Sequence, residues 1–264
     1  MKKFLVIGNP IEHSLSPKLQ NYWMKKNNIN GLYKKKKLND NELENLVSDI
    51  RNKNLIGVNV TVPFKRKIIS YIDELEPSAE KTQSVNTIYL KSNKVVGQNT
   101  DIDGFERALK FTKFETSGKK IFILGAGGVV PSIITALNKM KASTITISNR
   151  TRQKADDLKN LFKNIKIVDW GNIPDFDIII NSTSVGLNKN DVINLDFSNV
   201  GKNKMFYDLI YNPKETNFLK SAKKQGNFTE NGKMMFIYQA SSAFKIWHGI
   251  EPEINDEVIK FIDQ

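Results

Sequence analysis

A short apolar run that leads directly into glycines constrains the fold of this chain more than any other feature. Residues 121–124, which follow Lys120, are all apolar, and the run 120–124 predicts a buried strand. They run into Gly125-Ala126-Gly127-Gly128 and then into an apolar helical stretch over 133–140. This order suggests a dinucleotide site, because a helix N-terminus presents unpaired amides to a pyrophosphate. Val130 stands at the third position of the G-x-G-x-x-G pattern, so the loop alone is a weak signal.

The end of the next predicted strand, 144–148, indicates which dinucleotide is bound. An NAD site usually places Asp or Glu about 20 residues after the glycines, whereas this chain has Asn149-Arg150-Thr151-Arg152 followed by Lys154. A carboxylate there would repel a 2′-phosphate, while Arg150 can bind one with two charge-assisted hydrogen bonds. The plain alternative is a surface Arg beside a helix start. The position favours NADP(H) over NAD(H).

Short β-rich runs alternate with helical stretches along the whole chain, which is typical of an α/β protein. Strands are predicted at 4–7, 57–63, 165–168, 177–180 and 206–210, with a hairpin over 86–97. Helices are predicted from Ser16-Pro17, with Ser16 as the cap and Pro17 at the first helical position, after Asn39 or Asp40, after Thr151, and over 232–247 and 255–262. We expect a substrate-binding domain over 1–101, a Rossmann-like NADP-binding domain over 102–236, and helices over 237–264 that return to the first domain, with the active site in a cleft that closes on binding.

Composition adds limits to this picture. The chain has 264 residues, a formal net charge of +12 and no cysteine, which excludes disulfides and cysteine nucleophiles. Its excess of Lys is scattered, and the one tight cluster, 34–37, lies in an apparent edge strand. The apolar start at 4–7 is too short for a secretory signal. We therefore expect a cytoplasmic protein with a small-molecule substrate and without membrane, nucleic-acid or metal partners, either a monomer or a homodimer.

Polar side chains gather in four segments at predicted strand ends, where α/β proteins bind ligands. The four segments are 13–17, 59–65, 85–87 and 97–101. Each could be explained by caps and turns if taken alone. Together they offer hydroxyl, amide, ammonium and carboxylate groups, which a polyhydroxylated acid would need.

These segments give the chain its resemblance to the shikimate dehydrogenase family, which runs nearly end to end. The most specific match is Gly57-Val58-Asn59-Val60-Thr61-Val62-Pro63-Phe64-Lys65. The other matching motifs, in family order, are 8–17, 84–87, 97–104, 125–128, 149–151, 181–186, 208–213 and 231–240. Several ordered motifs are far more specific than any single one.

The resemblance implies reduction of 3-dehydroshikimate to shikimate with NADPH, and it implies roles for individual residues. Lys65 and Asp101 would form the catalytic pair, with Lys65 as the proton donor. The other substrate-binding residues would be Ser14, Ser16, Asn59, Thr61, Asn86 and Gln239. The cofactor-binding residues would be Gly125, Ala126, Gly127, Gly128, Asn149, Arg150, Thr151, Arg152, Lys154, Thr183, Tyr211 and Gly232.

The sequence departs from the family pattern at three places and leaves three alternatives open. Gln20-Asn21 replaces a His-Asn pair, Val129-Val130-Pro131-Ser132 lacks a common Arg, and Lys233 replaces a common Leu. His13 is interpreted as bracing its loop and His248 as structural. The alternatives are a quinate/shikimate dehydrogenase with broader cofactor choice, a non-catalytic sensor of shikimate or the dinucleotide, and another NADP oxidoreductase such as a folate dehydrogenase.

Overall fold

The chain passes from one folded unit to a second and then returns to the first. The computed structural model describes residues 1–263. Unit 1 comprises Met1–Gly104 and Ile237–Gln264, and unit 2 comprises Phe105–Phe236. The two crossings fall within α4 (Asp101–Phe111) and α8 (Lys233–His248).

Unit 1 is built on a mixed six-stranded sheet with the order β2-β1-β3-β5-β6-β4. Strands β1, β2 and β3 run parallel, while β5 pairs antiparallel with both β3 and β6. The β5–β6 pair is the predicted hairpin. The strands are β1 (Lys2–Gly8), β2 (Gly31–Lys37), β3 (Gly57–Val60), β4 (Glu74–Leu75), β5 (Thr87–Lys91) and β6 (Lys94–Gln98).

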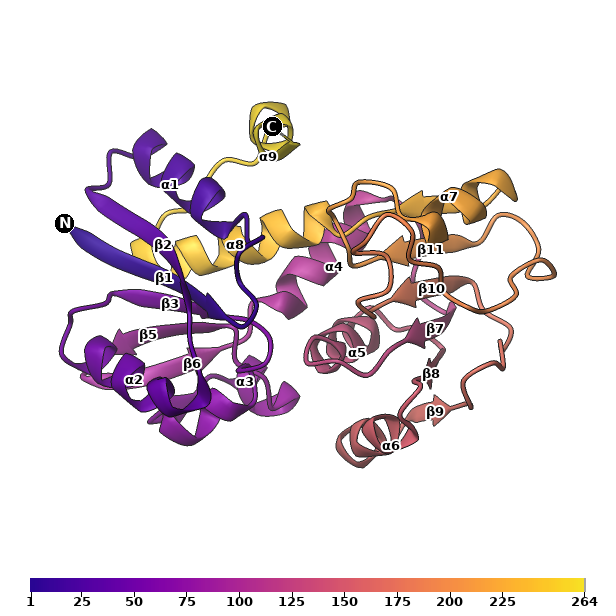
Figure 1. Ribbon diagram of the computed structural model, residues 1–264, viewed down its shortest axis with the longest axis horizontal. Helices are drawn as coiled ribbons and strands as arrows, with labels where there is room; N and C mark the ends of the chain where they lie inside the picture. The colour runs from indigo at the N-terminus through magenta and orange to yellow at the C-terminus, as the bar shows by residue number, and fades with distance from the viewer. Residues whose placement is uncertain (264) are drawn as a thin grey trace. The chain divides into compact units, whose positions relative to one another are not determined.

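Helices cover both faces of this sheet (Figure 1). Leu46, Val47 and Ile50 of α2 pack with Ile7 and Val58 in one cluster of buried residues. On the opposite face Trp23 of α1 contacts Phe244 of α8. The helical segments are α1 (Ser16–Lys26), η1 (Asp40–Glu42), α2 (Leu43–Arg51), η2 (Lys67–Tyr71), α3 (Pro77–Thr82) and α9 (Asp256–Asp263).

Unit 2 is built on a six-stranded sheet with the order β12-β11-β10-β7-β8-β9, in which every pairing is parallel. The strand order reverses between β7 and β10, and this switch point is where doubly wound sheets bind ligands. The strands are β7 (Lys120–Leu124), β8 (Thr144–Ser148), β9 (Ile165–Ile167), β10 (Ile178–Asn181), β11 (Met205–Asp208) and β12 (Phe228–Glu230).

Helices lie on both sides of this second sheet as well (Figure 1). Phe218, Leu219 and Ala222 of α7 pack with Phe122 and Phe206 in a buried cluster. On the other side, Phe105 of α4 meets Tyr207 edge to face, with ring centroids 5.4 Å apart. The remaining helices are α5 (Val130–Lys139), α6 (Arg152–Leu161) and α7 (Asn217–Lys224). The α/β class predicted from the alternation is confirmed.

Two helix starts differ from the sequence prediction. Helix α1 begins at Ser16 with Leu15 at the N-cap position, so Ser16 is the first helical residue rather than the cap. Helix α5 begins at Val130, three residues earlier than the predicted 133. Pro131 lies in its first turn, where the missing N–H of proline costs no hydrogen bond. The third glycine position of the loop is therefore a helix residue with a fully buried Val side chain.

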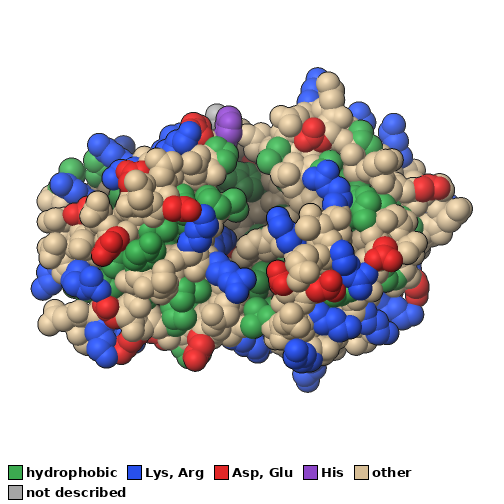
Figure 2. Space-filling view, turned by 60° about the horizontal axis from the view of Figure 1, so that its bottom comes forward, with side chains coloured by type: hydrophobic (Ala, Val, Ile, Leu, Met, Phe, Trp, Pro, Cys, Tyr) green, Lys and Arg blue, Asp and Glu red, His purple; other side chains and the backbone are tan. Residues whose placement is uncertain are grey.

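The positive charge is spread over the surface. Figure 2 shows Lys and Arg side chains scattered over one face with Asp and Glu among them. Lys34–Lys37 are exposed on β2, the edge strand of the first sheet, where charged side chains discourage pairing with another chain. Within residues 1–263 no helix is long and apolar enough to cross a membrane.

Candidate active site

The carboxyl ends of β1, β3 and β6 meet the amino end of β5 at one edge of the first sheet. This follows from the pairings, since β5 runs opposite to both of its neighbours. Six of the predicted substrate-site residues stand in the segments at this edge: Ser14, Ser16, Thr61, Lys65, Asn86 and Asp101. The sheet therefore brings together residues from four separate parts of the sequence.

The centre of the site is an ion pair between Lys65 and Asp101. Lys65 Nζ lies 2.5 Å from Asp101 Oδ2, and the two side chains are 12% and 6% exposed. The segment that carries Lys65 is fixed from both sides, because Phe64 is buried and the Lys65 carbonyl accepts from the Val85 amide at 2.8 Å. A charged pair taken out of water needs good geometry and further hydrogen bonds to be tolerated.

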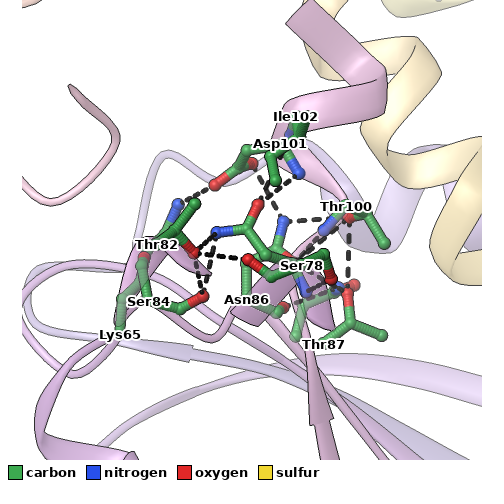
Figure 3. A network of polar contacts seen from close by, with 11 residues as sticks. Lys65, Ser78, Thr82, Ser84, Asn86, Thr87, Thr100, Asp101 and Ile102 are labelled. Carbon is green, nitrogen blue, oxygen red and sulfur yellow. Dashed lines mark hydrogen bonds and ion pairs between the residues drawn. The ribbon is translucent and has the colours of Figure 1, made fainter. Parts of the chain in front are cut away.

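Asn86 supplies those further bonds (Figure 3). Its Nδ2 donates to Asp101 Oδ1 at 2.9 Å and to Thr100 Oγ1 at 2.9 Å. Its Oδ1 accepts from the Thr100 amide at 2.8 Å. Each oxygen of the Asp101 carboxylate thus has a protein donor, and the ammonium and the carboxylate are held in one relative orientation.

Asp101 is also the first residue of α4, and Asn99 caps this helix. Asn99 Oδ1 accepts from the Asp101 amide at 3.0 Å, while its Nδ2 donates to the Ser84 carbonyl at 2.8 Å. A carboxylate in the first turn of a helix is stabilised by the helix dipole. The helix cap and the ion pair therefore hold Asp101 from two directions.

The other predicted substrate residues surround this pair less directly. Asn59 donates through Nδ2 to the Asn86 carbonyl at 3.0 Å and to Thr87 Oγ1 at 3.1 Å. The Ser16 amide donates to Ser14 Oγ at 3.3 Å. Thr61 follows β3 and is half-buried, and Gln239 is half-buried on α8. The network thus joins Lys65, Asn59, Asn86 and Asp101.

Every predicted cofactor residue follows the carboxyl end of a strand in the second sheet. The glycine loop follows β7, 149–154 follows β8, Thr183 follows β10, Tyr211 follows β11 and Gly232 follows β12. Because all these strands are parallel, the five segments share one edge of the sheet. The glycine loop and Thr183 stand at the switch point between β7 and β10, where dinucleotides bind in doubly wound folds.

Two of these glycines are required by their surroundings. Gly125 has a φ of +104°, and a Cβ there would lie 2.7 Å from Ser182 Oγ. A Cβ at Gly232 would lie 2.0 Å from the Leu209 carbonyl oxygen. A Cβ at Gly128 would meet nothing within 4 Å, so space is left at the loop for a ligand to approach the backbone. These features fit a dinucleotide phosphate.

The basic residues after β8 are in different situations. Arg152 pairs with Asp156 at 3.1 Å and with Asp169 at 2.5 Å. Arg150 is exposed and forms no ion pair within residues 1–263, and the same holds for Lys154. Arg150 and Lys154 are therefore available to an incoming phosphate, whereas Arg152 would first have to leave two carboxylates.

A buried network that sequence reasoning missed places Thr183. Asp208 Oδ1 accepts from Asn181 Nδ2 at 3.0 Å, and Oδ2 accepts from Thr216 Oγ1 at 2.7 Å. Asn181 Oδ1 in turn accepts from the Thr183 hydroxyl at 2.7 Å. Burial raises the pKa of Asp208, and the bonds from Thr216, Ile210 and Asn181 oppose this rise. The motifs 181–186 and 208–213 were recognised, but their mutual contact was visible only once β10 and β11 were paired.

A parallel sheet with a glycine loop at its switch point, together with a second α/β unit that holds a buried lysine–carboxylate pair, defines a two-domain pyridine-nucleotide dehydrogenase. Comparisons with known proteins narrow this class. The family model "Shikimate dehydrogenase substrate binding domain" matches residues 6–88, and "Shikimate / quinate 5-dehydrogenase" matches residues 106–217.

The similarity extends over the whole chain. A relative from Pelagibacter ubique named shikimate dehydrogenase (NADP(+)) is 56% identical over 262 residues, which is 99% of both chains. The shikimate dehydrogenase structure from Aquifex aeolicus superposes with a TM-score of 0.91 at 35% identity, covering 100% of this chain and 98% of that one. The Thermus thermophilus enzyme in complex with NADP(H) and shikimate superposes with a TM-score of 0.90 at 28% identity, and the match covers 100% of this chain and 99% of that one. The chain belongs to the shikimate dehydrogenase family.

Proposed function

We propose that this chain reduces 3-dehydroshikimate to shikimate with NADPH and also catalyses the reverse oxidation. The observation that carries the proposal is the buried ion pair, in which Lys65 Nζ lies 2.5 Å from Asp101 Oδ2. It lies in the unit whose residues 6–88 match the substrate-binding domain of the family. An ammonium held in this way can deliver a proton to an oxygen that becomes negatively charged.

The two side chains have different tasks in the proposed reaction. Bound NADPH supplies the hydride that reduces the C3 carbonyl. Lys65 donates a proton from Nζ to the carbonyl oxygen, which stabilises the charge where it develops. Asp101 holds Lys65 in place through Oδ2, and Asn86 fixes Asp101 through Oδ1. Because protein hydrogen bonds hold both side chains in this orientation, little reorganisation is needed during the reaction.

The substrate and the cofactor are assigned to separate groups of residues. We place the substrate carboxylate at Ser14 and Ser16, and the ring hydroxyls at Asn59, Thr61, Asn86, Asp101 and Gln239. The pyrophosphate lies on 125–128, and the 2′-phosphate lies on the basic segment 149–154. Thr183, Tyr211 and Gly232 lie near the nicotinamide. We further propose that the enzyme works in the cytoplasm as a monomer or homodimer.

The test is the absorbance of NADPH in a mixture of purified protein, shikimate and NADP. Matched reactions contain quinate in place of shikimate, or NAD in place of NADP. Reduction with shikimate and NADP alone is expected. Comparable rates with quinate or NAD would indicate the broader dehydrogenase, and folded protein without activity in any mixture would contradict the proposal.

A further inference from the structure

Tyr33 is a buried residue of β2 that the motif analysis did not single out. Its side chain is 1% exposed, although the four residues that follow it are exposed lysines. Its hydroxyl donates to Asn59 Oδ1 at 2.6 Å. This hydroxyl therefore touches a residue of the proposed substrate site that lies 26 positions away in the sequence.

The direction of this bond follows from the groups involved. An amide oxygen can only accept, so Tyr33 donates to Asn59. Burial raises the pKa of the Tyr33 hydroxyl well above its ordinary value, so the group keeps its proton over the working pH range. Tyr33 is therefore a permanent donor to Asn59.

The hydrogen-bond inventory of Asn59 shows what this donor does. Both Nδ2 hydrogens are used, by the Asn86 carbonyl at 3.0 Å and by Thr87 Oγ1 at 3.1 Å. Oδ1 has two lone pairs, and Tyr33 occupies one of them. The second lone pair remains for a ligand hydroxyl, and its direction is set by the bond to Tyr33.

The backbone of Tyr33 is fixed independently of its hydroxyl. Asn21 Oδ1 accepts from the Tyr33 amide at 2.9 Å, and Asn21 Nδ2 donates to the Tyr33 carbonyl at 2.8 Å. The centroid of the Tyr33 ring lies 6.0 Å from the centroid of the Trp247 ring. Removal of the oxygen alone should therefore leave the ring and β2 in place.

We propose that Tyr33 is a positioning residue of the substrate site, which acts by orienting the Asn59 amide toward the substrate. The inference rests on the proposed function, since that function makes Asn59 a substrate ligand. Tyr33 itself touches neither the reacting atoms nor the Lys65–Asp101 pair in any contact the structure records. Its contribution belongs to substrate affinity rather than to the chemical step.

The test is Tyr33→Phe, compared with wild type by steady-state kinetics and by calorimetric titration with shikimate. The loss of one buried hydrogen bond typically weakens affinity by about threefold to tenfold. We expect the Kd and KM for shikimate to rise by about that factor, with kcat changed less than about twofold and the KM for NADP unchanged. The control is Tyr207→Phe, because the buried Tyr207 hydroxyl has no hydrogen-bond partner within residues 1–263. That variant should keep the wild-type Kd for shikimate.

A double-mutant cycle separates positioning from a general structural effect. If Tyr33 acts mainly through Asn59, then adding Tyr33→Phe to Asn59→Ala should weaken shikimate binding little beyond Asn59→Ala alone. Additive effects, or an unchanged Kd in Tyr33→Phe, would overturn the inference. Wild-type protein that binds shikimate but does not oxidise it would overturn the proposed function alone, because the affinity comparison still tests Tyr33.

Discussion

The position of Asp101 is determined by several neighbours at once. The Asp101 amide donates a hydrogen bond to Asn99 Oδ1. One carboxylate oxygen accepts from Asn86, and the other forms the ion pair with Lys65. A residue held at three points has little freedom to adapt when one partner is removed. Substitutions around the pair should therefore change the rate of the chemical step more than substrate binding.

The first prediction concerns Lys65 itself. Lys65→Ala should lower kcat by on the order of 100-fold or more, because the developing negative charge loses its proton donor. The KM for shikimate should change less. Stopped-flow and steady-state absorbance measurements check both quantities. The matched control is Lys67→Ala, since the Lys67 side chain forms an exposed pair with Asp40. Near-normal turnover in Lys65→Ala would remove Lys65 from its proposed role.

The second prediction concerns Arg150 and cofactor choice. Arg150→Ala should raise the KM for NADP by about tenfold to a hundredfold, as expected for the loss of charged hydrogen bonds. The KM for NAD should change little, because NAD has no 2′-phosphate. Arg152→Ala should have a smaller effect, since Arg152 is already paired with Asp156 and Asp169. Equal effects of Arg150→Ala on both cofactors would show that Arg150 does not bind the phosphate.

At the scale of elements, the sequence predicted the strands better than the helices. Strands β7 and β8 have the predicted bounds, because continuous apolar runs ending at glycine or polar residues leave little ambiguity. Helix α4 was missed, since Asp101 and its neighbours were interpreted only as a binding motif. Helix α7 was missed as well. Its apolar face becomes visible as a buried surface only when Phe218 and Leu219 meet the sheet.

The site was predictable to a similar extent. Motifs identified Lys65, Asn86 and Asp101, and the sheet then brought them within hydrogen-bonding distance. Tyr33 was not predictable, because it lies 26 residues from Asn59 and begins a run of surface lysines. Strands β2 and β3 follow one another in the sequence but have β1 between them in the sheet, so this contact depends on strand order. No local pattern in this sequence revealed that order.

The last turn of α8 carries the third prediction. His248 lies against Phe244 and Phe4, with ring centroids 4.3 Å and 5.0 Å away, and its buried Nδ1 has no hydrogen-bond partner within residues 1–263. Burial and then Lys2 lower the pKa of His248 to about 4. A positive charge at a helix C-terminus is normally favourable, but burial outweighs that effect here.

A depressed histidine pKa means that the unfolded chain binds the proton more tightly. The free energy of unfolding should therefore be highest above about pH 6.5 and fall as the pH drops toward 4. Because the His248 side chain is only half-buried, we expect the free energy of unfolding to fall by about 1–2 kcal/mol, which is less than the full pKa shift would give. Urea unfolding at pH 7 and pH 5 measures the loss. His248→Gln should reduce it, whereas His13→Gln, which changes an exposed side chain, should not.

At the scale of the whole molecule, each unit contains a hydrophobic cluster of its own. One cluster packs α2 against the first sheet, and another packs α7 against the second sheet. Unit 1 is discontinuous, and its second segment is tied in by hydrogen bonds. Gln20 Nε2 donates to the Ala240 carbonyl at 2.9 Å, and Trp247 Nε1 donates to the Ile88 carbonyl at 3.2 Å. Each unit therefore has its own basis for stability.

This arrangement predicts that substrate and cofactor stabilise different parts of the chain. Trp170 is the one tryptophan of unit 2, while Trp23 and Trp247 belong to unit 1. In Trp170→Phe, tryptophan fluorescence therefore follows the unfolding of unit 1 alone. Shikimate at 100 times its Kd should stabilise that transition by about 2.7 kcal/mol, whereas NADP should stabilise it much less. An equal shift with both ligands would mean that the two units unfold as one cooperative structure.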